Sequence, residues 1–178
     1  MAGGRPRWTD TDQKEEQTVD ENGKKSLAMV VMSGDFDKLA GAFIIANGAA
    51  AMGMDVTMFF TFWGLRALKK NVGSGKTLFG KMIGLMYGDG IEKSHPSKFA
   101  FGGMGRWMFK KMMANHGVQT LSEMRDLAIQ LGVGLYACQM SMDVMEIPQE
   151  SFIDGVQDPV GVGFFLLKAQ NADIQLFI

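Results

Sequence analysis

The sequence predicts an α/β domain built on an open, mostly parallel sheet with helices on both faces. Short, continuous apolar runs recur along the chain, and such runs are typical of parallel strands that are buried on both faces. Apolar residues at helical spacing follow most of these runs. With 178 residues, 47% of them hydrophobic and 21% charged, the chain has the length and composition of one such domain.

The first two strands and the helix between them are predicted from residues 27–62. Residues 27–32 form an apolar run that ends at Ser33-Gly34-Asp35, the pattern of a buried strand that reaches a turn. Apolar residues then recur at helical spacing from Phe36, and Gly53 is expected to end that helix. Residues 56–62 are rich in β-branched and aromatic side chains and form the second strand. Strand, helix and strand within about 35 residues predict a right-handed βαβ unit.

The later elements continue this alternation. Thr120-Leu-Ser-Glu123 has the form of a capping box and opens a helix. One face of that helix carries Leu121, Met124, Leu127, Ala128 and Leu131. We then expect a strand over 133–138, a short helix from about Ser141, a brief strand near Gly155-Val156, a helix over about 160–171 and a last strand over 174–178.

Two segments depart from this pattern. Residues 1–26 are almost entirely polar and are predicted to be a flexible tail, which leaves 27–178 as a single domain. Residues 71–116 combine many glycines with methionines, aromatic residues and lysines, and they read as an insertion. Within it, Gly73-Ser-Gly-Lys-Thr77 resembles the end of a phosphate-binding loop. Lys70 stands where that motif requires glycine, and no buried strand precedes it, so nucleotide binding is not predicted.

Charge is distributed unevenly along the chain. The net charge is −1, yet residues 66–111 hold ten basic side chains against two acidic ones, and residues 112–178 hold eight acidic side chains against two basic ones. The basic stretch suits an acidic protein face or an anionic membrane surface, with a merely solvated face as the alternative. No recognisable nucleic-acid-binding module is present, so a nucleic acid partner is not expected.

The few cysteine and histidine residues argue against a disulfide-bonded or metal-binding protein. One cysteine, Cys138, excludes an intramolecular disulfide. The N-terminus has no apolar run that resembles a signal peptide, so we expect a cytoplasmic protein, with peripheral membrane contact left open. His95 and His116 have no partner at ligand spacing, so neither a metal nor another cofactor is predicted.

Cys138 is the candidate reactive residue. Ligands of open parallel sheets bind beyond the carboxyl ends of the strands, and Cys138 lies at such an end, just before a predicted helix. With Ser141 as the expected N-cap, backbone N–H groups would favour a thiolate, whereas Asp143 in the first turn would oppose it. An inert cysteine packed as a small hydrophobic residue is an equal alternative on position alone.

Three segments carry a family resemblance: Met54-Asp-Val-Thr-Met-Phe-Phe-Thr-Phe-Trp-Gly-Leu65, Tyr136-Ala-Cys-Gln-Met-Ser-Met-Asp-Val-Met145 and Phe152-Ile-Asp-Gly-Val156. They resemble the DsrE/DsrF-like sulfurtransferase family, and within it the branch sometimes labelled peroxiredoxin-like. The resemblance covers about residues 27–178. It implies a three-layer α/β/α sandwich on a five-stranded sheet, homo-oligomers, and a persulfide on Cys138 that is exchanged with small sulfur-carrier proteins.

Residues in the loops at the carboxyl ends of the strands are expected to surround Cys138. The residues expected to line the site or support the thiolate are Gly34, Asp35, Phe62, Trp63, Gly64, Gln139, Met140 and Ser141. Phe62, Trp63 and Met140 are expected to shield the persulfide, with ordinary core packing as the alternative for Phe62 and Met140. The residues Met104, Trp107, Met108 and Met112 suggest an oligomer interface. Two other functions stay open: a redox enzyme or sensor oxidised at Cys138, and a non-catalytic scaffold that docks through 71–116.

Overall fold

The computed structural model describes residues 23–70, 90–94, 108, 111 and 115–178. Four parallel strands form one sheet in the order β3-β2-β1-β4. Their bounds are β1 (Ser26–Val31), β2 (Asp55–Phe60), β3 (Gly134–Ala137) and β4 (Ile174–Phe177). The apolar runs that predicted these strands lie in the sheet as expected, with β1 and β2 at its centre and almost wholly buried.

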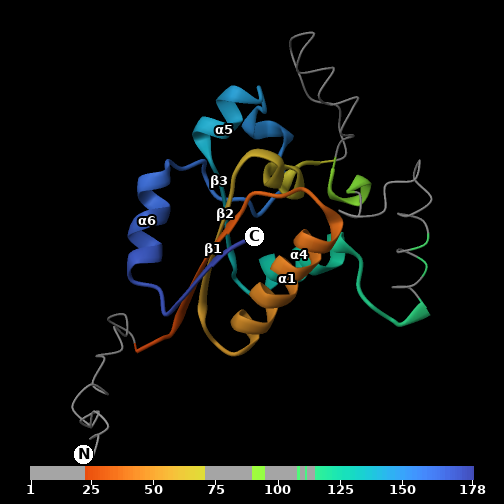
Figure 1. Ribbon diagram of the computed structural model, residues 1–178, viewed down its shortest axis with the longest axis horizontal. Coiled ribbons are helices and arrows are strands. Elements are labelled where there is room, and N and C mark those ends of the chain that lie inside the picture. The colour runs from red at the N-terminus through yellow and green to blue at the C-terminus, as the bar shows by residue number, and fades with distance from the viewer. Residues whose placement is uncertain (1–22, 71–89, 95–107, 109–110, 112–114) are drawn as a thin grey trace, which may run out of the picture.

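Helices cover both faces of the sheet, as Figure 1 shows. Helix α1 (Phe36–Ala51) and helix α4 (Leu121–Gln130) pack together on one face, and helix α6 (Val162–Gln170) lies on the other. Helix α5 (Gln139–Val144) stands beyond the carboxyl ends of the strands. Three short 3-10 helices complete the elements: η1 (Phe62–Leu68), η2 (Ile91–Lys93) and η3 (Gln149–Ser151).

The two faces enclose hydrophobic clusters of different size. The larger cluster joins the sheet to α1 and α4, and within it the rings of Phe43 and Phe60 lie 6.2 Å apart. The smaller cluster lies under α6 and contains Ala28, Phe59, Cys138, Phe165 and Ala169. Cys138 therefore belongs to the thinner of the two cores.

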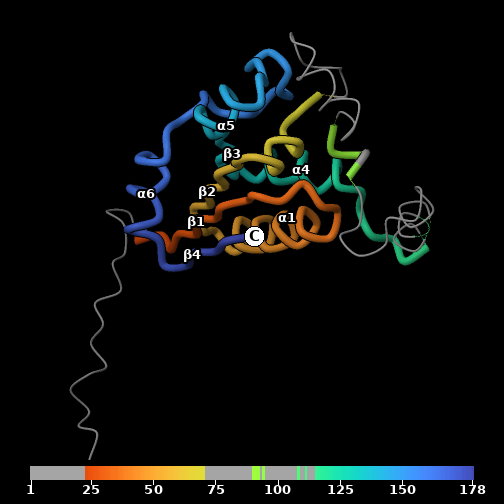
Figure 2. The backbone as a smooth tube through the Cα atoms, turned by 45° about the horizontal axis from the view of Figure 1, so that its top comes forward, coloured from red at the N-terminus to blue at the C-terminus, as the bar shows by residue number. Residues whose placement is uncertain are grey.

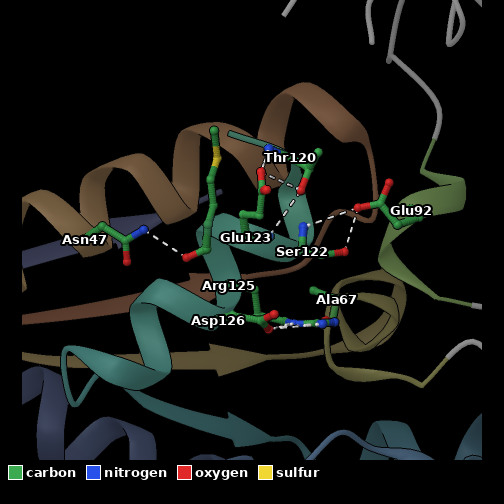
Figure 3. Close-up of polar contacts among 9 residues, drawn as sticks. Asn47, Ala67, Glu92, Thr120, Ser122, Glu123, Arg125 and Asp126 are labelled. Atoms are coloured by element: carbon green, nitrogen blue, oxygen red, sulfur yellow. Dashed lines mark hydrogen bonds and ion pairs between the residues drawn. The ribbon is translucent and has the colours of Figure 1, made fainter. Parts of the chain in front are cut away.

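The N-terminus of α4 is fixed by the capping box that the sequence predicted. The Thr120 hydroxyl accepts a hydrogen bond from the backbone N–H of Glu123 at 3.2 Å, and the Thr120 backbone N–H donates to Glu123 Oε2 at 2.7 Å. Glu92 adds a second acceptor, because its Oε1 accepts from the backbone N–H of Ser122 at 3.3 Å and from the Ser122 hydroxyl at 2.6 Å (Figure 3). These bonds satisfy N–H groups that a helix end otherwise leaves without partners.

Two hydrogen bonds between residues far apart in the sequence attach α4 to its neighbours (Figure 3). Asn47 of α1 donates from Nδ2 to the carbonyl oxygen of Met124 at 2.9 Å. Arg125, which is buried, donates from its guanidinium to the carbonyl oxygen of Ala67 at 3.1 Å. The α1/α4 layer is thus held by polar contacts as well as by apolar packing.

The expectation of five strands is wrong, because the described residues form a sheet of four. The brief strand expected near Gly155-Val156 is reduced to two isolated bridges, which pair Leu135 with Val156 and Cys138 with Val160. Gly155 adopts a φ of +91° just before the first bridge, and Pro159, which has no N–H, precedes the second. Beyond β3 the chain therefore runs alongside the sheet without forming a continuous ladder.

Several predictions fall on parts of the chain outside the described residues. They include the tail up to residue 22 and most of the insertion at 71–116, with Met104, Trp107, Met112, His95 and the glycine-rich Gly73–Thr77. Searching the described helices finds none with the length and apolar character that a membrane crossing needs.

Candidate functional site

The carboxyl edge of the sheet brings the predicted site residues into one region. Gly34 and Asp35 follow β1, residues 62–64 follow β2, and residues 138–141 follow β3. Parallel strands end at the same edge, so these three loops are neighbours. Figure 2 shows the same edge from a second direction, with α5 beyond it.

Two predicted residues, Gly34 and Gly64, serve the close packing of these loops. The backbone N–H of Gly64 donates to the carbonyl oxygen of Met32 at 2.9 Å, and a Cβ on Gly64 would overlap the carbonyl oxygen of Val31. A Cβ on Gly34 would lie 2.7 Å from the carbonyl oxygen of Trp63. Both positions therefore require glycine for steric reasons, whatever else they do.

Cys138 is the residue that joins β3 to α5. Its backbone is extended, with φ −74° and ψ 113°, and it occupies the N-cap of α5. Its N–H donates to the carbonyl oxygen of Phe60 at 2.9 Å, and its carbonyl oxygen accepts from the N–H of Met142 at 3.0 Å. Only 4% of the residue is exposed. Its side chain lies in the small cluster with Phe59 and Phe165.

The expected cap of this helix is wrong. Ser141 is not the N-cap, because α5 begins at Gln139, two residues earlier, and Cys138 itself supplies the extended residue that precedes a helix. Asp143 consequently falls beyond the first turn, where it accepts a hydrogen bond from Gln139 Nε2 at 2.8 Å. Ser141 instead forms a hydrogen bond between its Oγ and Thr61 Oγ1, at 2.7 Å.

The large side chains expected to shield Cys138 are at the surface. Phe62, Trp63 and Met140 are all exposed, so the core-packing alternative does not apply to Phe62 or Met140 either. Phe62 also has a φ of +46°, an uncommon backbone conformation for a bulky residue. The aromatic residues buried in the same cluster as Cys138 are Phe59 and Phe165, and neither was predicted from the sequence to belong to the site.

Asp35 and the lysines after β2 have local partners. Asp35 Oδ2 lies 3.3 Å from Lys38 Nζ, an ion pair in which both side chains are partly exposed. Lys69 is buried, and its backbone bridges to Phe152, whereas Lys70 Nζ lies 3.5 Å from Asp154 Oδ1. Lys69 is therefore not part of an exposed basic face, and the prediction of an anionic partner rests mainly on residues outside the described ranges.

Other kinds of site find little support in the described part of the chain. That part contains no group of three or more His, Cys, Asp and Glu side chains that is able to hold a metal ion. A pocket of about 180 Å³ lies at the opposite end of the strands from Cys138, with Ser26, Asp55, Thr57 and Lys168 among its lining residues. Ligand pockets usually measure about 300–1,000 Å³, so this one is small for an organic substrate.

Comparison with known proteins decides the family. The model of the DsrE/DsrF/DrsH-like family matches residues 23–177, nearly the whole chain. The chain belongs to this family. Among DsrE/DsrF/DrsH-like relatives, the uncharacterized protein YrkE of Bacillus subtilis is 41% identical over 156 residues, which cover 86% of this chain and 97% of YrkE. The sulfur carrier protein DsrE2 of Allochromatium vinosum is 36% identical over 159 residues, which cover 87% of this chain and 99% of DsrE2.

A solved structure agrees with this family assignment at the level of fold. The YchN protein of Escherichia coli superposes with a TM-score of 0.51 over 87% of this chain and 99% of YchN. Its sequence is only 13% identical, so the similarity concerns the architecture alone. The resemblance stated from the sequence is thereby confirmed for family and for an α/β fold with a parallel sheet.

Proposed function

We propose that this protein is a sulfur-relay protein in which Cys138 accepts sulfane sulfur as a persulfide and passes it to small carrier proteins. The observation that carries the proposal is the sole cysteine of the chain at the carboxyl end of a parallel strand. Ligands of such sheets bind at that edge. Family membership supports a role in sulfur relay, because one relative that matches nearly full length is named a sulfur carrier protein.

The chemistry requires one thiol and no change in net oxidation state. The Cys138 thiolate attacks the terminal sulfur of a donor persulfide, a new S–S bond forms on Cys138, and the donor leaves as a thiolate. An acceptor thiolate then attacks the terminal sulfur on Cys138, and the Cys138 thiolate is released. Each step makes one S–S bond and breaks one, so neither an oxidant nor a resolving cysteine is needed.

The burial of Cys138 imposes a condition on this chemistry. The donor persulfide must reach the Cys138 sulfur, yet this residue is only 4% exposed and belongs to the hydrophobic cluster that also contains Phe165 of α6. Access therefore requires a local displacement of α6 or of the loops at the carboxyl edge. Helix α6 is nine residues long and packs on the smaller of the two hydrophobic clusters, so we expect it to be displaced more easily than the α1/α4 pair.

The alternative of a thiol redox enzyme or sensor has less support. Redox-sensing cysteines are typically accessible and stand next to a resolving cysteine. Cys138 is buried, and the chain contains no second cysteine. The scaffold alternative depends on residues 71–116, most of which lie outside the described ranges.

The decisive experiment measures intact mass after incubation with glutathione persulfide. We expect a gain of one sulfur atom that dithiothreitol removes, and no gain in Cys138→Ser. The serine hydroxyl is not ionised, so it is a far weaker nucleophile. The variant should still fold, with a stability loss in the ordinary range of about 0.5–3 kcal/mol. A parent protein that never gains sulfur, or gains only oxygen from peroxide in a separate sample, would overturn the proposal.

The proposal includes self-association of the chain. Helix α1 leaves Ile44, Ile45 and Met52 exposed, together with two glycines, Gly41 and Gly48, that have open space above them. No charged residue lies between Leu39 and Met54, although the outer face of a surface helix is usually polar. Such a face is typical of an interaction surface.

Sedimentation velocity tests this part of the proposal. We expect an oligomer at micromolar concentration, and a shift toward monomer when Ile44 and Ile45 are both replaced by Asp. A parent protein that sediments only as a monomer would contradict self-association and leave the sulfur chemistry untouched.

A further inference from the structure

Two buried hydroxyl groups lie at the carboxyl edge of the sheet, just beyond the ends of strands β2 and β3. Thr61, which follows β2, is 9% exposed, and Ser141, in α5, is 0% exposed. Their oxygens are 2.7 Å apart and share one hydrogen bond. Within the described residues neither hydroxyl has another hydrogen-bond partner.

The register of the sheet places Thr61 next to Cys138. Phe60 pairs with Ala137, and the residues that follow, Thr61 and Cys138, are both still extended. Side chains alternate along an extended chain, so Thr61 lies on the same face as Phe59, and Cys138 on the same face as Tyr136. That face is the one covered by α6. Neighbouring parallel strands are about 4.8 Å apart, so Thr61 and Cys138 are adjacent on one face.

The Thr61–Ser141 hydroxyl pair has one hydrogen left to donate. Two hydroxyl groups carry two hydrogens, and the bond between them uses one. The second hydrogen therefore remains for an acceptor that lies close to the pair. The hydrophobic cluster that contains Cys138 is otherwise formed by Ala28, Phe59, Phe165 and Ala169, with the partly buried Tyr136 and Val160 packed against it.

We propose that the Thr61–Ser141 hydroxyl pair donates this hydrogen bond to the terminal sulfur of a persulfide on Cys138. The inference rests on the proposed function and assigns two positioning residues to it. No hydrogen bond joins the resting cysteine to either hydroxyl in the described structure. The terminal sulfur of a persulfide lies one S–S bond, about 2.05 Å, beyond Sγ, and the additional reach brings the acceptor toward the pair.

The energetic reason lies in the apolar surroundings of Cys138. A persulfide anion on a residue that is buried in a hydrophobic cluster is costly unless a donor faces it. A hydrogen bond to a charged acceptor is stronger than one between neutral groups. The pair therefore favours the loaded form of Cys138 over the empty form, which is what a carrier needs in order to hold sulfur between donor and acceptor.

The test compares two properties of Cys138 in matched variants. One is the fraction loaded at equilibrium with a fixed ratio of glutathione persulfide to glutathione, measured by intact mass. The other is the rate at which iodoacetamide alkylates the empty thiol. Thr61→Val removes one hydroxyl, and the double variant Thr61→Val/Ser141→Ala removes both. Thr61→Ser keeps a hydroxyl at position 61. Thr57→Val is the control, because Thr57 is 5% exposed on the same strand and the same face, next to Gly134 instead of Cys138.

The expected result is a loading constant that falls about tenfold or more in the double variant, and by less in Thr61→Val, in which the Ser141 hydroxyl keeps its own hydrogen. Thr61→Ser should recover most of it, and Thr57→Val should not change it. Alkylation of the empty thiol should stay within about twofold of the parent protein, since the bond forms only with the persulfide. Unchanged loading in both valine variants overturns the inference, and so does an equal loss in Thr57→Val or a parallel fall in alkylation. If the parent protein never gains sulfur, the proposed function fails as well. If the parent loads and the variants load equally well, only this inference fails.

Discussion

On one face of the sheet α1 and α4 pack as a pair, while on the other α6 is the one helix among the described residues, and its Phe165 shares a cluster with Cys138. The paired layer is fastened by a capping box, by the Asn47 amide and by the buried Arg125 guanidinium. The single helix has two ring contacts, with Phe165 stacked on Phe59 at 5.2 Å and Phe164 against Tyr136 at 4.7 Å. Two polar contacts join its C-terminal part to the sheet: Gln175 Nε2 donates to the carbonyl oxygen of Ala169 at 2.8 Å, and Lys168 Nζ lies 3.9 Å from Asp55 Oδ2. The larger hydrophobic cluster lies on the face away from the thiol, so we expect the face over the thiol to open more easily.

The largest effect should come from the paired face. Phe43 is fully buried against Phe60, and Phe43→Ala removes a ring from the main core. We expect a loss of about 3–5 kcal/mol in the free energy of unfolding, measured by urea denaturation. Ile44→Ala is the matched control, since Ile44 is the next residue of α1 but is 57% exposed, and it should cost far less. Equal losses in the two variants would contradict the placement of the main core.

The second test removes part of the cover on the other face. Phe165→Ala should lower stability by less than Phe43→Ala, because a thin layer bordered by solvent can collapse into the space left behind. In native protein it should also accelerate alkylation of Cys138 by iodoacetamide about tenfold or more. Leu166→Ala, on the exposed side of α6, serves as the control. An alkylation rate that stays at the parent value in Phe165→Ala would show that α6 does not control access.

A smaller effect is expected at the helix cap. Thr120→Ala removes the hydroxyl that accepts from the Glu123 N–H, and it should cost about 1 kcal/mol. Thr120→Ser keeps an acceptor at the same place and should restore most of that loss. Alkylation of Cys138 should be unchanged in both variants. A faster reaction in Thr120→Ala would mean that the two faces open together.

The smallest effect concerns the exposed glycine of α1. Gly48→Ala should raise the free energy of unfolding by about 0.5–1 kcal/mol, because alanine favours the helix and nothing lies within 4 Å of its Cβ. Gly53→Ala is the control and should destabilise, since Gly53 has a φ of +84°. If a second copy packs closely on this face, Gly48→Ala will also shift sedimentation toward monomer. A stabilised protein whose sedimentation is unchanged would point to an interface elsewhere.

The sequence was informative wherever one local pattern decides the structure. The apolar runs located β1 and β2, and Thr120 to Glu123 located the start of α4. The fifth strand was predicted wrongly, because Gly155 and Pro159 interrupt a ladder whose two valines alone look like a strand. Cys138 was placed correctly at a strand end, since an apolar run followed by a helix is visible in the sequence.

The surroundings of Cys138 were harder to predict. Thr61 becomes a neighbour of Cys138 only through the register of β2 against β3, which pairs residues far apart in the chain. Phe165 joins the cluster of Cys138 because α6 crosses this face, and helical spacing alone does not reveal which strand the helix covers. Phe62 and Trp63 looked like shielding residues because they are large and follow a strand, yet the turn after β2 carries them outward.

The central position of β1 has a consequence for folding while the chain is being synthesised on the ribosome. One neighbour of β1 is β2, but the other is β4, and the bond from the Ser26 N–H to Asp173 Oδ2 closes a separation of 147 residues. At about 5–20 residues per second, β1 waits roughly 7–30 s for its second partner to be synthesised. During that time one edge of a strongly apolar strand has no partner from its own chain. Folding is therefore expected to be slow for a domain of this size and most sensitive to chaperones before β4 emerges.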